Sequence, residues 1–304
     1  MYWQQFLEAA SRRTPLADTN VMRLFDGSGD GHPSWIVEDW AGHWLVGSNS
    51  PYKPEGAEAL LAGAKGFECK SVWWKWLDQA QKVSPVFLAG EAPKMPFKVK
   101  ENGLSFLVNF ESGFSQGLFL DQRLNRAKVR ARVKPGDRVL NLFAYTAAFS
   151  VAAASGGALT TTVDLSQHYL DWGKENFSLN GLEPSDHYWI KGDAIEWLAQ
   201  FVKKGRKFEG IIIDPPTFSR AVKTRKTFQV ERDYRTLVEH AAQILVPGGW
   251  MMACTNARTL EHEEFAAQIR EVWRENGRFA AKIEELPMPP EFTGEQYLKA
   301  VWVE

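Results

Sequence analysis

Hydrophobic and polar positions divide the chain into a first part of short strands and a second part in which strands and helices alternate. In the first part, residues 21–25, 34–37, 44–46 and 72–76 are rich in strand-favouring side chains, and residues 56–64 have helix-forming composition. This pattern predicts a small α+β domain over residues 1–92. Trp73, Trp74 and Trp76 are expected to pack in its core, with a base-stacking platform as the alternative.

A linker and a hairpin follow this first part. Residues 91–96 contain two prolines, which predicts a linker. Phe97 and Val99 alternate with lysines, Asn102-Gly103 comes next, and alternation resumes as far as Phe110. Asn-Gly between alternating segments predicts a β-hairpin.

From Asp121 onward the apolar period switches between that of helices and that of strands. Asp121 is expected to cap a helix whose apolar side carries Leu124, Ala127 and Ala131. Strands are predicted at residues 138–143, 158–163, 187–190, 208–213, 249–254 and 296–302, and helices at residues 146–154, 166–180, 194–203, 229–245 and 261–274. The alternation predicts an α/β domain over residues 93–304, with a Rossmann-like parallel sheet and helices on both faces.

Length and composition narrow the class of protein. A chain of 304 residues has room for two domains. No apolar run approaches the roughly 18–20 residues that span a bilayer, and the first residues lack the blocks of a secretory signal. Two distant cysteines, Cys69 and Cys254, predict neither a disulfide framework nor a cysteine zinc site. We therefore expect a cytoplasmic protein with no membrane partner.

The distribution of charge is more informative than its sum. A net charge of -1 does not favour a dedicated nucleic-acid module, which is usually strongly basic. Basic residues nevertheless gather over residues 123–134 and again over residues 220–235. A solvated surface is the alternative for each stretch. The second stretch follows directly on the most informative motif, and this position favours contact with phosphates.

Acidic residues follow three consecutive predicted strands, where open α/β sheets bind their ligands. Asp164 stands about 20 residues beyond the predicted strand at residues 138–143, where an acid binds the hydroxyls of a ribose. Asp193 is placed to meet an adenine edge, and Asp214 ends the next strand. A helix cap is the alternative for Asp164 and for Asp193. Taken together, the three acids favour a cofactor site.

The most informative motif is the sequence IIIDPPTF at residues 211–218. Its apolar run predicts a buried central strand. The two prolines prevent a helix from starting at once, because each lacks an N–H and biases the preceding residue to extended geometry. The result is a stiff loop that holds Asp214 in place, and Phe218 offers a ring on which a planar base can stack.

Several common functions are not supported by the sequence. No Gly-x-Gly-x-x-Gly follows the first strand of the second part, which argues against a nicotinamide dehydrogenase. No Walker loop is present, and no two histidines have metal-ligand spacing. We therefore expect no metal site.

At this point a resemblance to a known family becomes specific. It is carried by GLFLDQR at residues 117–123, LNLFAYT at 140–146, TVDLS at 162–166, LNGL at 179–182 and DPPTFS at 214–219. From about residue 102 to residue 256, the chain resembles bacterial 23S ribosomal RNA methyltransferases that include the guanine-N7 half of a bifunctional enzyme and a cytosine-C5 enzyme. The first part is similar to the strand–strand–helix–strand–strand domain that precedes the catalytic domain in this family.

The resemblance implies S-adenosylmethionine as cofactor and RNA as partner. Asp121 and Arg123 match positions near the methionine end of the cofactor, Phe143 and Tyr145 match the loop beneath it, and Asp214 matches the catalytic loop. The full set of residues expected at the cofactor is Phe119, Asp121, Arg123, Asn141, Phe143, Tyr145, Thr146, Asp164, Leu165, Ser166, Gly192, Asp193, Ala194 and Asp214. Ala147-Ala148 departs from the family, whose members often carry glycine there, so this loop is expected either to approach the cofactor less closely or to bend differently.

A second departure bears on the target atom. Transfer to cytosine C5 needs a thiol that adds to the ring. Alignment on Gly248-Gly249 places Asn256 where the C5-type relative has its cysteine, and leaves Cys254 inside the strand as a small buried hydrophobe. The guanine-N7 relative also has asparagine at this position. Guanine N7 carries an exposed lone pair and needs no nucleophile, so a ring nitrogen, with guanine N7 favoured, is the predicted acceptor.

The resulting hypothesis is direct displacement, in which the protein mainly aligns the reactants. Asp214 accepts hydrogen bonds from the base, the Pro215-Pro216 turn fixes its direction, and Phe218 stacks on the base. RNA contacts are expected from Arg220, Lys223, Arg225, Lys226 and Asn256.

Two alternatives remain at this point. One is a methyltransferase that acts on a small molecule or a protein, which the near-neutral charge suits. The other is a non-catalytic RNA-binding factor on the same fold, against which the intact set of three acids argues. The sequence is also compatible with a homodimer.

Overall fold

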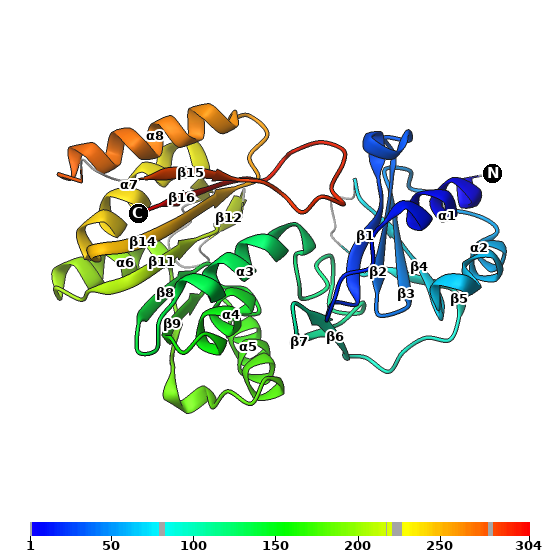
Figure 1. The fold of residues 1–304 in the computed structure, drawn as a ribbon, viewed down its shortest axis with the longest axis horizontal. Coiled ribbons are helices and arrows are strands. Elements are labelled where there is room, and N and C mark those ends of the chain that lie inside the picture. The colour runs from blue at the N-terminus through cyan, green and yellow to red at the C-terminus, as the bar shows by residue number, and fades with distance from the viewer. Residues whose placement is uncertain (1, 79–82, 217, 221–226, 279–281) are drawn as a thin grey trace. The chain divides into compact units, whose positions relative to one another are not determined.

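The computed structural model describes the chain except for residues 1, 79–82, 217, 221–226 and 279–281, and it leaves out the side chains of residues 2, 218–220 and 227–233. Two compact units form (Figure 1). The first comprises Met1–Arg123 and Met288–Gln296, and the second comprises Leu124–Pro287 and Tyr297–Glu304. Each unit is described here by itself.

The first unit is built on a five-stranded sheet with the order β1-β2-β3-β4-β5, in which only β3 and β4 pair in parallel. Its elements are α1 (Tyr2–Arg12), β1 (Val21–Asp26), η1 (Gly27–Asp30), β2 (Trp35–Trp40), β3 (His43–Ser48), α2 (Ala57–Gly63), η2 (Ala64–Phe67), β4 (Ser71–Trp76), β5 (Val86–Gly90), β6 (Phe97–Glu101), β7 (Leu104–Val108) and η3 (Leu120–Gln122). The four predicted strands and the predicted helix of residues 56–64 are confirmed. The helix α1 and the strand β5 were not predicted.

The tryptophans of this unit serve packing. Trp73 and Trp74 are buried, and their indole N–H groups donate to the hydroxyls of Ser71 and Ser48. Trp76 is half-buried and donates to the carbonyl of Asn49. Burial with a satisfied N–H is the usual state of a core tryptophan, so the packing interpretation holds for Trp73 and Trp74.

The hairpin β6–β7 belongs to the first unit by packing. The backbone N–H of Lys100 donates to Asn20 Oδ1, and that of Asn102 donates to Thr19 Oγ1. The first compact unit extends to Arg123. The boundary predicted from the sequence lies earlier, between residues 92 and 93. Asp121 does not cap the following helix as expected, because it lies within η3 and α3 begins at Arg123.

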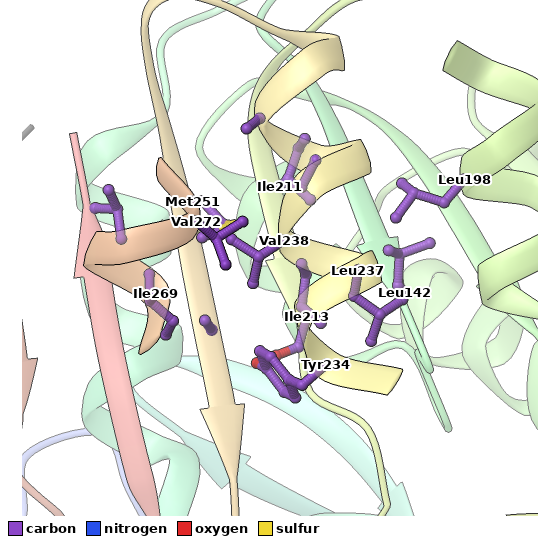
Figure 2. Close-up of a cluster of buried hydrophobic side chains, with 14 of the residues drawn as sticks. Leu142, Leu198, Ile211, Ile213, Tyr234, Leu237, Val238, Met251, Ile269 and Val272 are labelled. Atoms are coloured by element: carbon purple, nitrogen blue, oxygen red, sulfur yellow. The ribbon is translucent and has the colours of Figure 1, made fainter. Parts of the chain in front are cut away.

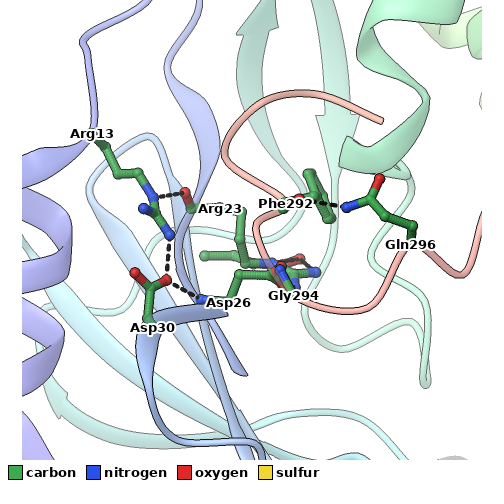
Figure 3. A network of polar contacts seen from close by, with 8 residues as sticks. Arg13, Arg23, Asp26, Asp30, Phe292, Gly294 and Gln296 are labelled. Carbon is green, nitrogen blue, oxygen red and sulfur yellow. Dashed lines mark hydrogen bonds and ion pairs between the residues drawn. The ribbon is translucent and has the colours of Figure 1, made fainter. Parts of the chain in front are cut away.

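A late segment of the chain, Met288–Gln296, completes the first unit (Figure 3). The N–H of Gly294 donates to Asp26 Oδ2 at 2.7 Å, and Asp26 also forms a buried ion pair with Arg23. The Arg23 guanidinium lies 4.5 Å from the centre of the Phe292 ring. These polar groups satisfy one another inside the unit, as buried charges must.

Asp39, on β2, makes the first unit sensitive to pH. Burial raises the pKa of Asp39 to about 6. Two interactions oppose this rise and lower the pKa: the N–H of Gly42, which donates to Asp39 Oδ1, and the positive charge of Lys70. A raised pKa in the fold means that this group contributes stability below its ordinary pKa of 3.8, and that this contribution is lost as the pH rises through 6.

We therefore expect Asp39→Asn, which keeps an acceptor for Gly42, to stabilise the protein by ~1–2 kcal/mol near neutral pH. At about pH 4 the variant and the wild type should have similar stability. Thermal unfolding as a function of pH measures the difference. A gap of the same size at both pH values would contradict the assignment.

The second unit is an α/β domain with a seven-stranded sheet in the order β10-β9-β8-β11-β14-β16-β15. Its elements are α3 (Arg123–Arg132), β8 (Arg138–Leu142), α4 (Ala148–Ser155), β9 (Leu159–Asp164), α5 (Gln167–Leu179), η4 (Pro184–Asp186), β10 (Tyr188–Lys191), α6 (Ala194–Lys203), β11 (Phe208–Ile213), β12 (Phe218–Arg220), β13 (Thr227–Gln229), α7 (Val230–Ile244), β14 (Leu245–Thr255), α8 (His262–Glu275), β15 (Ile283–Leu286) and β16 (Lys299–Val303).

The predicted alternation of strands and helices is confirmed, with a difference at one end of the sheet. The strands β10, β9, β8, β11 and β14 run parallel, whereas β16 is antiparallel to both β14 and β15. The strand β15 was not predicted.

Helices cover both faces of this sheet. On one face α6, α7 and α8 bury a cluster that includes Leu142, Ile211, Ile213, Leu237 and Met251 (Figure 2). On the other face, α4 contacts β8 and β9, and α5 contacts β9 and β10. None of the helices within the described ranges is long and apolar enough to cross a membrane.

Candidate active site

The order of the parallel strands reverses between β8 and β11, which makes their carboxyl ends the switch point of the sheet. Open α/β sheets bind ligands at such a point. The next strand outward from β8 is β9, and neighbouring strands lie about 4.8 Å apart. Asp164 at the end of β9 and Asp214 after β11 therefore stand on one edge, with the loop after β8 between them.

Asp164 links three strand ends through its backbone and its side chain. Its Oδ2 accepts the N–H of Tyr145 at 2.8 Å, and its Oδ1 accepts the N–H of Ser166 at 2.8 Å. Its own carbonyl accepts the N–H of Gly192, which follows β10. A carboxylate has about four lone-pair sites, so these two bonds leave acceptor capacity for ligand hydroxyls. Burial raises the pKa of Asp164, and the two N–H bonds oppose that shift.

The loop between β8 and α4 has a backbone that few side chains adopt. Phe143, Tyr145 and Ala147 have φ angles of 56°, 51° and 60°. Each non-glycine residue in this left-handed region costs of order 1 kcal/mol. The N–H bonds of Ala144 to Val163 O and of Tyr145 to Asp164 hold the loop in place. Ala147, at the N-cap of α4, is left-handed, the conformation that a glycine at this position adopts most readily.

Two of the predicted cofactor residues have structural bonds beneath this loop. Asn141 is buried in β8 and donates to Ser150 Oγ, which also bonds Thr162 Oγ1. Thr146 is buried, and its carbonyl accepts a hydrogen bond from Asn176 Nδ2 at 3.0 Å. These bonds fix the floor of the loop to α4 and α5.

The end of β10 carries the helix cap that was the alternative for Asp193. Its Oδ1 accepts the N–H groups of Ile195 and Glu196, so Asp193 is the N-cap of α6. Gly192 has no room for a side chain, because a Cβ would lie 2.2 Å from Trp197 Nε1. The buried Ala194 begins the helix. A cap at the sheet edge remains compatible with a ligand contact through Asp193 Oδ2.

Leu165 and Ser166 turn the chain from β9 into α5. Ser166 is the N-cap of α5, and its hydroxyl accepts the N–H of Tyr169. Leu165 is 38% exposed at the sheet edge. An apolar side chain next to Asp164 offers a surface for a planar heterocycle.

The Asp-Pro-Pro motif follows the buried strand β11. Asp214 is half-buried, Pro215 is buried and Pro216 is exposed. Phe218 and Arg220 lie on β12, which pairs antiparallel with β13 in a two-stranded sheet, and their side chains are not described. Lys223, Arg225 and Lys226 lie outside the described residues.

Sequence reasoning missed the residue that supports this motif from below, Tyr234 on α7. Its hydroxyl is buried within hydrogen-bonding distance of Ile213 O at 3.2 Å and of Cys254 O at 3.0 Å. It therefore joins the ends of β11 and β14 directly before Asp214 and close to Asn256. Burial raises the pKa of Tyr234 well above its ordinary value, so the hydroxyl remains a donor.

We expect Tyr234→Phe to lower the free energy of unfolding by about 1 kcal/mol, because a buried carbonyl loses its donor. Turnover should fall roughly tenfold through misplacement of Asp214, while cofactor affinity stays unchanged. Steady-state kinetics, thermal unfolding and calorimetry measure the three quantities. An equal loss of cofactor affinity would point to general loosening of the sheet edge instead.

The end of β14 bears on the choice of acceptor atom. Cys254 is fully buried inside the strand, as predicted, and Asn256 is exposed just after it. The second cysteine, Cys69, lies in the first unit, where burial raises the pKa of its thiol to about 12. Neither cysteine is thus an exposed thiol that ionises readily.

Three predicted cofactor residues belong to the first unit, so the structure does not group them with the others. Phe119 is 49% exposed and Asp121 is half-buried. Arg123 is buried, and its Nη2 donates to both carboxylate oxygens of Glu291 at 2.7 and 2.8 Å. This ion pair gives Arg123 a structural partner that the sequence did not indicate.

The second unit suits a cofactor that carries a ribose and an adenine. Asp164 has spare acceptor capacity, Leu165 offers an exposed apolar surface, and the strained loop after β8 presents its backbone at the same edge. Strain that the surrounding bonds hold in place is typical of a preformed ligand site.

Comparison with known proteins agrees with this geometry. Residues 77–302 match the family described as S-adenosylmethionine-dependent methyltransferase. The Bacillus subtilis protein YwbD, which bears a provisional name as a ribosomal RNA large subunit methyltransferase, is 32% identical over 300 residues, covering 96% of this chain and 75% of YwbD. The ribosomal RNA large subunit methyltransferase K/L of Methylococcus capsulatus is 38% identical over 205 residues, covering 67% of this chain. This chain spans only 27% of that longer relative.

A solved structure is similar over nearly the whole chain. SMU.776, provisionally named a methyltransferase and crystallised in complex with SAH, matches with a TM-score of 0.85 and 27% identity. The match covers 99% of this chain and 80% of that one.

Proposed function

Because this chain belongs to the S-adenosylmethionine-dependent methyltransferase family, we propose that it methylates a base of ribosomal RNA, with guanine N7 as the favoured acceptor. The family and the cofactor follow from the match over residues 77–302. The RNA substrate and the atom are proposals, as are a cytoplasmic location and the Phe119, Asp121 and Arg123 cofactor contacts. A homodimer stays a prediction.

The residues at the sheet edge have separate duties toward the cofactor. Asp164 would accept the ribose hydroxyls, Asp193 and Leu165 would flank the adenine, and the loop of Phe143 and Tyr145 would support the methionine end. When bound, S-adenosylmethionine supplies an activated methyl group on a sulfonium. Every one of these protein groups lies at the end of β8, β9 or β10, so the cofactor would extend along that edge toward Asp214.

The observation that carries the proposal is the placement of Asp214 at the switch point. It is half-buried on a stiff loop whose base is held by the Tyr234 hydroxyl. From there Asp214 can accept hydrogen bonds from the edge of a base and so fix the direction of the lone pair on the base's acceptor nitrogen. For an acceptor that is already nucleophilic, alignment of this kind supplies most of the lowering of the barrier.

The cysteines favour a ring nitrogen over cytosine C5. Methylation of C5 needs a thiolate that adds to the ring. Cys254 is fully buried, and the pKa of Cys69 is raised to about 12. Asn256 is exposed just after β14, at the position where a nucleophile would be needed, and a side-chain amide cannot act as that nucleophile. Guanine N7 requires no such group.

RNA is favoured as the substrate by two independent observations. The relatives named above carry ribosomal RNA methyltransferase names. In addition, Arg220, Lys223, Arg225 and Lys226 follow directly on the Asp-Pro-Pro motif in the sequence. Cations at this position would hold the phosphates around a base presented to Asp214.

The decisive experiment is mass spectrometry of nucleosides from total RNA, with the ribosomal RNA also analysed separately, of a strain that lacks the protein, compared with its parent. We expect one methylated guanosine to disappear, and to return with the wild-type gene but not with Asp214→Ala. If no RNA class changes, the acceptor is a small molecule or a protein. Labelled cofactor incubated with fractionated extract would then identify it.

A further inference from the structure

The edge of the second unit opposite Asp164 and Asp214 contains a cavity. It lies where β8, β9, β10 and β11 begin, and its volume is about 320 Å³. Its walls include Arg138, Leu159, Tyr188, Arg206 and Lys207. Because the strands are parallel, no residue of the candidate active site lines it.

One wall of the cavity is apolar and open to solvent. Tyr188, the first residue of β10, is 59% exposed, and Leu159, the first residue of β9, is 44% exposed. Both are among the few large apolar side chains in the described residues that are more than a third exposed. An exposed ring beside an exposed aliphatic side chain forms a surface on which a planar group can stack.

The other wall is cationic. Arg138 is neutralised by Glu209, with bonds of 2.7 and 3.0 Å. Lys207 donates to the carbonyl of Gln243, an uncharged partner. The Arg206 guanidinium lies 5.9 Å from the centre of the Tyr188 ring, and within the described part of the chain it forms no ion pair.

We propose that this cavity binds one nucleotide of the substrate RNA, away from the base that is methylated. Tyr188 stacks on the base of that nucleotide, and Arg206 and Lys207 contact its phosphate. An aromatic ring next to cations is the arrangement by which proteins hold single-stranded nucleic acid. This inference rests on the proposed RNA substrate.

The size of the sheet makes simultaneous contact feasible. Strands of five or six residues separate the two edges by roughly 15–20 Å. A ribosomal RNA segment that presents one base to Asp214 is long enough to pass around the sheet to the opposite edge. The cavity would then add affinity and leave the chemical step unchanged.

The test uses the full chain and a short fluorescein-labelled single-stranded RNA, with binding measured by anisotropy over a range of salt. Tyr188→Ala should weaken binding about tenfold, the effect of losing one base stack. Arg206→Ala should weaken binding and lower the slope of log affinity against log salt by about 0.7, the share of one phosphate contact on a single strand.

The matched control is Arg270→Ala, which removes the same charge from an exposed position on α8 and should change neither quantity. Melting temperature and S-adenosylmethionine affinity should match the wild type in all three variants, because these side chains are exposed. If both cavity variants bind RNA as the wild type does, the inference is overturned and the proposed function stands. If the wild type binds the cofactor but not this RNA, the inference is overturned, and nucleoside mass spectrometry of the deletion strain decides the proposed function separately.

Discussion

Asp214→Ala is expected to lower the rate of methyl transfer by about 10²–10³-fold, the typical effect of removing a group that orients the reacting atoms. The carboxylate stands at the switch point between β8 and β11, on a loop stiffened by Pro215 and Pro216. Without it the base loses the acceptor that fixes its direction. Cofactor affinity should stay within about fivefold of the wild type, because Asp164, the residue proposed to bind the ribose, lies two strands away.

Single-turnover kinetics with saturating cofactor measure this effect, and calorimetry measures cofactor affinity. Asp214→Asn is the matched control, since it keeps one acceptor oxygen and the size of the side chain. It should retain more activity than Asp214→Ala if the role is hydrogen bonding. Near-wild-type turnover of Asp214→Ala would remove Asp214 from the mechanism.

Asp164→Ala should have the second largest effect, a loss of about 100-fold in S-adenosylmethionine affinity. Hydrogen bonds to a charged acceptor contribute ~1.5–3 kcal/mol, and this carboxylate would accept the ribose hydroxyls. The substitution also releases the N–H groups of Tyr145 and Ser166, so the strained loop after β8 loses its anchor. Isothermal calorimetry measures the affinity directly.

The pH dependence of binding offers a check on the same residue. Burial raises the pKa of Asp164, so the carboxyl takes up a proton at a higher pH than an ordinary aspartate does. A protonated carboxyl is a poorer acceptor, so cofactor affinity should fall as the pH decreases through that raised pKa. In Asp164→Asn this dependence should vanish. Cofactor affinity that is unchanged in Asp164→Ala would rule out the ribose role.

Local patterns in the sequence were sufficient for the second unit and its edge. Strand and helix periods are properties of short segments, and parallel strands bring their carboxyl ends to one edge whatever the helices do. The sequence alone therefore places Asp164, Asp193 and Asp214 at one edge of the sheet. The burial of Cys254 followed in the same way, since an apolar run in a central strand is buried on both faces.

The sequence by itself thus determined the α/β class, the acids at the carboxyl ends of the strands and the stiff Asp-Pro-Pro loop, whereas the order of the strands came from the structure. Only the tertiary structure decided which distant groups hold these parts in place. The Tyr234 hydroxyl on α7 lies within hydrogen-bonding distance of two carbonyls at the ends of β11 and β14. Glu291 forms an ion pair with Arg123, which is far from it in sequence, and Met288–Gln296 belongs to the first unit. Such contacts join residues far apart in sequence. The hydrophobic periodicity of a short segment cannot predict them, because each contact depends on how the whole chain packs.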